Sequence, residues 1–424
     1  MVESFDAYCN VYFKIETMNI AFLLHTYPGI GGTETVSNML ANYFLTNISK
    51  SGKEEIIPKV IAWKRGKKHH VNVSFADIDD VFYLPDSESL DTDENLAAIL
   101  QYVQENHINI IINQGPFWRG SRKLQTIGCR LISVLHYAPS FRIDNQRNAI
   151  ERLYHISGKG LMYKLKTNVR YCFKEYFAKR DFKKTDFLFL REVIDNSDAF
   201  VVLCPAYIKE LKILLELKEV KNIIAIPNPI GKDTKLNSDN NTPHRTILFV
   251  GRLTAWDKRV DRLLDIWNQI YKDYPDWECC IVGDGEERSS LEQQAKEMKL
   301  QRITFTGFQN PSPYYQVAGV LCLTSSTEGL PMVILEAAGY GCPTITYGVS
   351  SGIKELIIDA QTGFIISPFN QQEYIKKLKL LMDNATLREK MGKNAHSRLR
   401  NYEIDAIGNN WLSLFNKILK RNEG

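Results

Sequence analysis

Short apolar runs alternate with amphipathic segments along this chain, and the alternation starts afresh near its middle. Runs with the character of buried strands occupy residues 19–25, 59–64, 108–114, 130–136 and 198–204, and then 246–252, 277–285, 303–308, 319–325 and 343–348. Strands that are apolar along their whole length suit a parallel sheet covered by helices on both faces. The sequence therefore predicts an α/β protein with two doubly wound, Rossmann-like domains.

A polar stretch at 226–245 separates the two series of strands. It contains three prolines, many Asn and Asp residues and no periodicity, which is typical of a linker. We therefore expect an N-terminal domain at 18–229 and a C-terminal domain at 243–403, with a cleft between them. The end of the chain, at 404–424, is expected to form an amphipathic helix that returns to the first domain. Ligands of such sheets bind at the carboxyl ends of the strands.

Composition excludes several classes of protein. The chain has 53 Lys and Arg against 49 Asp and Glu, which is not the strongly basic balance of a nucleic-acid-binding protein. Its eight cysteines form no C-x-x-C pair, so we expect reduced thiols in the cytoplasm and no disulfide framework or zinc site. No apolar run reaches about 18 residues, so no transmembrane helix is expected. Residues 1–17 lack the basic start and apolar stretch of a signal peptide.

A glycine-rich segment, "HTYPGIGGTETV" at 25–36, follows the first strand and opens the first helix. Gly29, Gly31 and Gly32 would let the backbone approach a ligand closely. The free N–H groups at the start of the helix would attract an anion. The spacing is not G-x-G-x-x-G, which disfavours a dinucleotide-dependent oxidoreductase. The alternative is a plain glycine-rich turn.

Two cations flank the loop after the first strand of the second half. Arg252 follows the strand directly, and Lys258 lies six residues later, near the start of an amphipathic helix. Two cations beside a helix N-terminus suit a diphosphate, through charge-assisted hydrogen bonds. The alternative is a solvated basic loop.

Two glutamates, Glu328 and Glu336, lie eight residues apart in "TSSTEGLPMVILEAAGYGCPTIT". A proline suits the first helical turn, so we expect a helix that starts near Gly329 with the N–H groups of residues 332–334 unpaired. The two carboxylates would be roughly 12 Å apart. They could hold two ends of a long ligand, such as a sugar and a ribose. The alternative is a buried helix whose glutamate satisfies the helix dipole.

These motifs together resemble GT-B glycosyltransferases of family 4, the group 1 glycosyltransferases. The resemblance covers nearly the whole chain from Met18. It rests on the E-x7-E signature "EGLPMVILE" and on further motifs in the family's order: "GG-x-E" at 31–34, "VGRL…DK" at 250–258, "IVGDGEE" at 281–287, "FTGF" at 305–308 and "TGFIISP" at 362–368. It implies an acceptor-binding first domain and a nucleotide-sugar-binding second domain.

The resemblance also implies roles for single residues. Arg252 and Lys258 would bind the donor diphosphate and stabilise the leaving group. Glu328 would contact the donor sugar, Glu336 the ribose hydroxyls, and His136 the region near the donor sugar. Further donor contacts are implied at Gly32, Gly329, Met332, Val333 and Phe308.

Family members retain the anomeric configuration and need no metal, so we expect no cofactor and no metal. Two D-x-D pairs, Asp77 with Asp79 and Asp91 with Asp93, lie far from the other motifs in a polar stretch. Such pairs bind metal in glycosyltransferases of another fold, but here we interpret them as solvated loop residues. One departure from the family is Arg259, where a small glycine is common after the lysine.

The segment at 141–190 interrupts the alternation. It carries twelve basic and five acidic residues, with ten Phe and Tyr side chains between them. Basic helices with interleaved aromatics favour an anionic membrane surface. The alternative is a solvated helical insertion. A lipid-linked acceptor at the inner face of the membrane would suit the first interpretation.

We therefore expect an enzyme of the hexosyltransferase type (EC 2.4). It would move a sugar from a nucleotide-diphosphate sugar, UDP-linked in preference to GDP-linked, to a lipid-linked or polysaccharide-precursor acceptor. One alternative is a GT-B nucleotide-sugar epimerase, which would need an acid/base pair around the sugar and no acceptor surface. Another is a non-catalytic nucleotide-sugar-binding subunit. No nucleic-acid partner is expected.

Overall fold

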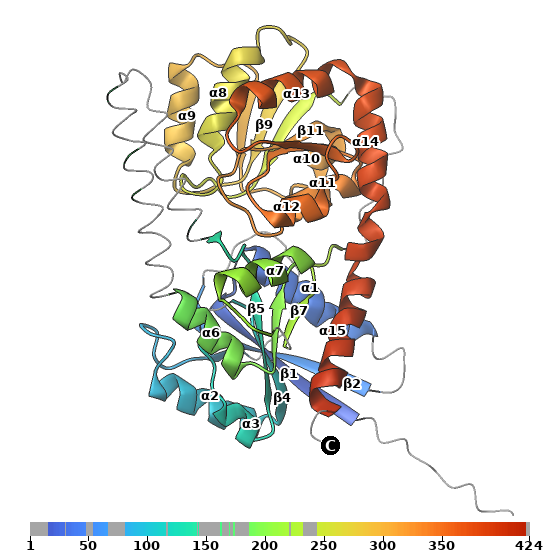
Figure 1. The fold of residues 1–424 in the computed structure, drawn as a ribbon. Helices are drawn as coiled ribbons and strands as arrows, with labels where there is room; N and C mark the ends of the chain where they lie inside the picture. Colours follow the sequence, from blue (N-terminus) through green and yellow to red (C-terminus); the bar gives the residue numbers. More distant parts are fainter. Residues whose placement is uncertain are drawn as a thin grey trace, which may run out of the picture.

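A computed structural model of the chain describes residues 16–29, 31–47, 54–66, 81–115, 118–141, 186–219, 222–231 and 244–420, and the single positions 143, 162, 169 and 173. Most of the basic segment at 141–190 and the middle of the predicted linker lie outside these residues. Within them, the strands form two parallel sheets, each covered by helices on both faces (Figure 1).

The first sheet has the strand order β3-β2-β1-β4-β5-β6-β7, so the order reverses between β1 and β4. Its strands are β1 (Glu16–Tyr27), β2 (Glu54–Arg65), β3 (Val81–Tyr83), β4 (Ile108–Asn113), β5 (Arg130–Leu135), β6 (Ala199–Val202) and β7 (Ile223–Ala225). Its helices are α1 (Gly32–Asn47), α2 (Asp93–Glu105), α3 (Lys123–Thr126), α6 (Asp186–Asn196) and α7 (Pro205–Leu214).

The second sheet has the order β10-β9-β8-β11-β12-β13. Its strands are β8 (Thr246–Val250), β9 (Glu278–Val282), β10 (Ile303–Gly307), β11 (Ala318–Leu323), β12 (Thr344–Tyr347) and β13 (Gly363–Ile366). Its helices are α8 (Val260–Ile270), α9 (Arg288–Glu297), α10 (Ser312–Val317), α11 (Met332–Gly339), α12 (Ser351–Leu356), α13 (Gln371–Asp383) and α14 (Ala385–Ser397).

Every strand predicted from an apolar run is present, and β3, β7 and β13 are additional. The added strands have only three or four residues, which is too short to give a period in the sequence. The central strands β5, β6 and β11 are buried along their whole length, as parallel strands between two helical layers must be.

The chain returns to the first sheet at its end. A 3₁₀ turn (Leu399–Tyr402) leads into α15 (Ile404–Leu419), which packs against α1 (Figure 1). The Trp411 and Phe415 rings share an apolar cluster with Phe44, and the Tyr43 hydroxyl donates to Asn409 Oδ1 at 3.2 Å. Burial of this apolar face on the first sheet fixes where the last helix lies. No helix of the described residues is long and apolar enough to cross a membrane.

The two sheets meet through α7 and α12. The Tyr207 hydroxyl on α7 donates to the Gly329 carbonyl at 2.8 Å, and the Ser351 hydroxyl donates to the Glu210 carboxylate. Within the second half, a Cβ on Gly352 would lie 2.1 Å from the Gly329 carbonyl oxygen, so only glycine lets α12 approach this carbonyl. The two hydrogen bonds between the halves place α7, which follows β6, against the loop after β11 and the start of α12.

Candidate functional site

The centre of the candidate site is an ion pair at the carboxyl edge of the second sheet. Lys258 Nζ lies 2.8 Å from Glu328 Oε1 and 3.0 Å from Glu328 Oε2, although 70 residues separate them. The Ser325 hydroxyl donates to the same carboxylate at 2.6 Å, and the Glu328 side chain is only 6% exposed. Lys258, predicted to bind the diphosphate, and Glu328, predicted to contact the donor sugar, therefore form an ion pair with each other.

The loop between β8 and α8 is tied to the loop that carries Glu328. Asp257 is buried, and its carboxylate accepts hydrogen bonds from the Thr254 hydroxyl and from the Lys258 N–H. Its carbonyl accepts the N–H of Ser326 at 2.6 Å. Asp257 thus fixes the backbone on both sides of the ion pair.

Arg252, the other predicted diphosphate ligand, has an exposed side chain. It forms no ion pair with any residue in the described ranges, but it lies close enough to Glu34 to offset part of the rise that burial causes in the pKa of that carboxyl group. Arg252 therefore remains available to an anionic ligand beside the ion pair.

The glycine-rich loop of the first sheet is covered by its own glutamate. A Cβ on Gly31 would lie 2.3 Å from Glu34 Oε2, and one on Gly29 would lie 2.9 Å from Glu34 Cγ. Burial raises the pKa of Glu34, and Arg252 partly offsets this effect. A Cβ on Gly32 would meet nothing within 4 Å, so the open space that a ligand could enter lies at Gly32.

His136 lies against the loop of the second half that carries Gly329. It directly follows β5, and a Cβ on Gly329 would lie 2.4 Å from the His136 carbonyl oxygen. Its Nε2 is 2.5 Å from Gln114 Oε1, and burial lowers the pKa of His136 to about 4. The imidazole is therefore neutral at pH 7.

Helix α11 starts later than the sequence predicts. It begins at Met332 with Pro331 as its N-cap, and not near Gly329, because the loop before it stays extended. The prediction of an unpaired Ile334 N–H is wrong, since this group donates to the Pro331 carbonyl at 3.1 Å. Met332 and Val333 are partly exposed, and their N–H groups have no backbone partner in the described chain.

Glu336 lies further along α11 and has a partner of its own. The hydroxyl of the buried Tyr315 donates to Glu336 Oε2 at 2.8 Å. Burial raises the pKa of Glu336, and the Tyr315 hydrogen bond opposes that shift. Phe308, after β10, is 39% exposed at the opposite edge of the sheet from β13.

An aromatic bridge across the junction was not predicted from the sequence. Trp256, two residues before Lys258, is 43% exposed, and its ring centroid lies 5.8 Å from that of Phe141. Phe141 in turn lies 5.2 Å from Tyr137, which follows His136. The sequence feature that could have indicated this contact is a tryptophan in an otherwise polar loop, next to a residue predicted to bind the diphosphate.

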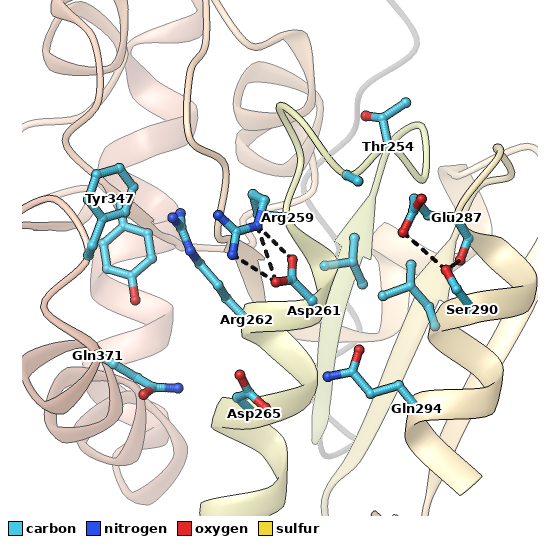
Figure 2. A pocket seen from close by; sticks show the side chains of 14 residues that line it. Thr254, Arg259, Asp261, Arg262, Asp265, Glu287, Ser290, Gln294, Tyr347 and Gln371 are labelled. Atoms are coloured by element: carbon cyan, nitrogen blue, oxygen red, sulfur yellow. Dashed lines mark hydrogen bonds and ion pairs between the residues drawn. The ribbon is translucent and has the colours of Figure 1, made fainter. Parts of the chain in front are cut away.

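Arg259 adopts a left-handed backbone conformation, with φ of 50°. Its guanidinium pairs with Asp261 (Figure 2). Its carbonyl accepts the Thr324 hydroxyl at 2.9 Å. A cavity of about 580 Å³ opens beside it over α8, with side chains of both charges such as Arg262 and Asp265 in its wall (Figure 2). None of Arg252, Lys258, Glu328, Glu336 and His136 lines this cavity, so it is separate from the candidate site.

The D-x-D pair of Asp91 and Asp93 does not join the site. Asp91 accepts the Arg119 N–H at 2.9 Å and lies 3.3 Å from Arg119 Nε, while Asp93 lies in the first turn of α2. Asp77 and Asp79 fall outside the described residues. Within the residues that the structure describes, no group of three or more His, Cys, Asp or Glu side chains is placed to hold a metal ion.

Comparison with known structures identifies the class of fold. The crystal structure of the Anabaena protein HepE in complex with UDP superposes with a TM-score of 0.66 at 16% identity, covering 94% of this chain and 100% of that chain. The two facing parallel sheets are those of the GT-B fold. The predicted class, α/β with two Rossmann-like domains in the GT-B arrangement, is confirmed.

Comparison of sequences points to a family for the second half. Residues 232–398 match the family described as glycosyl transferases group 1. An uncharacterized glycosyltransferase of Haemophilus influenzae is 34% identical over 220 residues, 51% of this chain and 61% of that protein. A Campylobacter jejuni N-acetylgalactosaminyltransferase, named for an undecaprenol-diphosphate-linked saccharide, is 29% identical over 201 residues, 47% of this chain and 56% of that protein. Each match spans less than two thirds of the relative's length.

Proposed function

We propose that this protein is a family 4 glycosyltransferase that moves a sugar from a nucleotide-diphosphate sugar to an acceptor, with retention of configuration. The observation that carries the proposal is the Lys258–Glu328 pair at the junction with His136, beside Arg252, which forms no ion pair with the described part of the chain. A cationic site for the diphosphate thus adjoins a carboxylate that can accept sugar hydroxyls.

The proposed chemistry follows from where charge develops. Breaking the bond between the anomeric carbon and the diphosphate oxygen leaves negative charge on the diphosphate and positive charge on the sugar. Arg252 and Lys258 would stabilise the diphosphate. Glu328 would accept hydrogen bonds from the sugar hydroxyls, and Glu336 from the ribose. Two fixed cations at the diphosphate support a reaction without a metal ion.

The donor and acceptor are proposed from the comparisons. HepE, which has a similar fold, was crystallised in complex with UDP, and this supports a UDP-sugar donor in preference to a GDP-sugar donor. The Campylobacter relative is named for a lipid-linked saccharide, which supports a lipid-linked or polysaccharide-precursor acceptor. Attachment to an anionic membrane surface through the basic segment at 141–190 would bring the enzyme to such an acceptor.

A thermal-shift panel of UDP- and GDP-sugars tests the proposal. A ligand at 100 times its dissociation constant adds about 2.7 kcal/mol to the free energy of unfolding. Each nucleotide sugar that raises the melting temperature is then incubated without acceptor, and release of the nucleotide is measured. Slow hydrolysis is expected of a transferase. Binding without hydrolysis would indicate a binding subunit, a new nucleotide sugar would indicate an epimerase, and no binding at all would refute the proposal.

A further inference from the structure

Gln114 is a buried polar residue that the proposed reaction does not use. It directly follows β4 and is 1% exposed, and its Oε1 lies 2.5 Å from Nε2 of His136. Its backbone N–H donates to the Leu23 carbonyl on β1 at 2.9 Å. Gln114 therefore lies where the strand order of the first sheet reverses, the place where doubly wound sheets bind their ligands.

The contact between the two side chains determines the position of a proton. A ring nitrogen and an amide oxygen can approach to 2.5 Å only if a hydrogen lies between them, because two lone pairs would repel. The neutral imidazole has a single N–H, so this proton is on Nε2 and Nδ1 keeps its lone pair. His136 Nδ1 has no hydrogen-bond partner within the described ranges, and the residue is partly exposed.

The amide oxygen of Gln114 has the His136 ring as its partner, whereas the amide Nε2 is buried with no hydrogen-bond partner in the described chain. The side chain is enclosed, and the backbone on both sides is tied, since the Gly115 N–H also donates to the Asn113 carbonyl at 3.0 Å. With the amide oxygen toward the ring, only the Nε2–H form of His136 makes this hydrogen bond.

We propose that Gln114 is a positioning residue, which fixes the tautomer of His136 so that Nδ1 presents a lone pair to the sugar of the donor. A lone pair accepts a hydrogen bond from a sugar hydroxyl and repels a carboxylate. The subsite consequently selects a neutral hexose over the corresponding hexuronic acid. This specificity rests on the proposed function, because it requires a nucleotide sugar beside His136.

The tautomer is measured by nuclear magnetic resonance of protein labelled with ¹⁵N-histidine. His136→Asn identifies the signals of His136, and His396, whose Nδ1 lies 3.1 Å from the Gly339 carbonyl, serves as an internal reference for the opposite tautomer. We expect neutral His136 with its proton on Nε2 in the wild type. Gln114→Leu should lose that preference and Gln114→Glu should give a protonated ring, because a neighbouring carboxylate favours the charged form. A proton on Nδ1 in the wild type would overturn the assignment.

The specificity is measured by binding of matched pairs: UDP-glucose with UDP-glucuronate, and GDP-mannose with GDP-mannuronate. The wild type should bind the neutral member more tightly, and Gln114→Glu should reduce that preference by roughly tenfold, the effect of one hydrogen bond to a charged group. An unchanged preference in a variant whose ring is protonated would refute the selection. If no nucleotide sugar binds, the selection fails together with the proposed function, while the spectrum still decides the role of Gln114.

Discussion

Lys258→Ala should destabilise the protein as well as inactivate it. The Lys258 side chain is 20% exposed and that of Glu328 is 6% exposed, so the substitution leaves a buried carboxylate with Ser325 as its remaining partner. Removing one partner of a buried ion pair costs about 3–5 kcal/mol, because the other charge stays buried without compensation. Because the Lys258 side chain is partly exposed, we expect a loss in the free energy of unfolding at the lower end of this range, about 3 kcal/mol.

This loss is large enough to measure by thermal unfolding. A change of 1 kcal/mol shifts the melting temperature by about 2–4 °C for 150–250 residues, so Lys258→Ala should melt roughly 6–12 °C lower. The double variant Lys258→Met with Glu328→Gln removes both charges and should recover most of the stability, since neutral replacement of a buried pair is often harmless. Its hydrolysis of the donor should stay low, because the diphosphate has lost a cation.

A surface pair provides the matched control. Lys379 lies 2.8 Å from Asp273, with side chains 36% and 62% exposed. Lys379→Ala should change stability by no more than about 0.5 kcal/mol, since solvent screens such pairs. The reasoning is refuted if Lys258→Ala melts within about 2 °C of the wild type, or if the double variant is as unstable as the single one.

Four further outcomes are expected. Arg252→Ala should lower donor turnover by about 10²–10³-fold without changing the melting temperature, because its side chain is exposed and forms no ion pair in the described chain; near-normal turnover would contradict its role. EDTA should leave turnover intact, whereas a loss restored by Mg²⁺ or Mn²⁺ would show a metal requirement. The pKa of His136 is about 4 when folded against 6.5 unfolded, so the unfolded chain binds more protons between these values and stability falls as the pH falls from 6.5 to 4. Between pH 6.5 and 4, the free energy of unfolding should fall less steeply for His136→Asn than for the wild type, by at most about 1.4 kcal/mol per pH unit. The same pH dependence for both proteins, measured by denaturant unfolding, would disprove the role of His136. The basic segment at 141–190 should bind anionic liposomes and release them at high salt; equal binding to neutral liposomes would exclude an electrostatic attachment.

The sequence by itself determined the class of fold. Apolar runs of six to nine residues between amphipathic segments carry the signal of buried parallel strands, because period and length are local properties. The same reasoning located His136 and Arg252 directly after strands and Lys258 in the loop that follows, and ligands of doubly wound sheets bind at the carboxyl ends of the strands. It overlooked β3, β7 and β13, whose three or four residues are too few to show a period.

Tertiary structure alone decided which of these groups touch. The pairing of Lys258 with Glu328 joins two loops 70 residues apart, and the contact of His136 with Gly329 joins two different sheets. No pattern in the sequence indicated that Glu34 would lie over its own glycine loop or that Gln114 would contact His136. Such contacts depend on the order of strands and on how one sheet packs against the other, and these are set by the packing of the whole core, which no local period records.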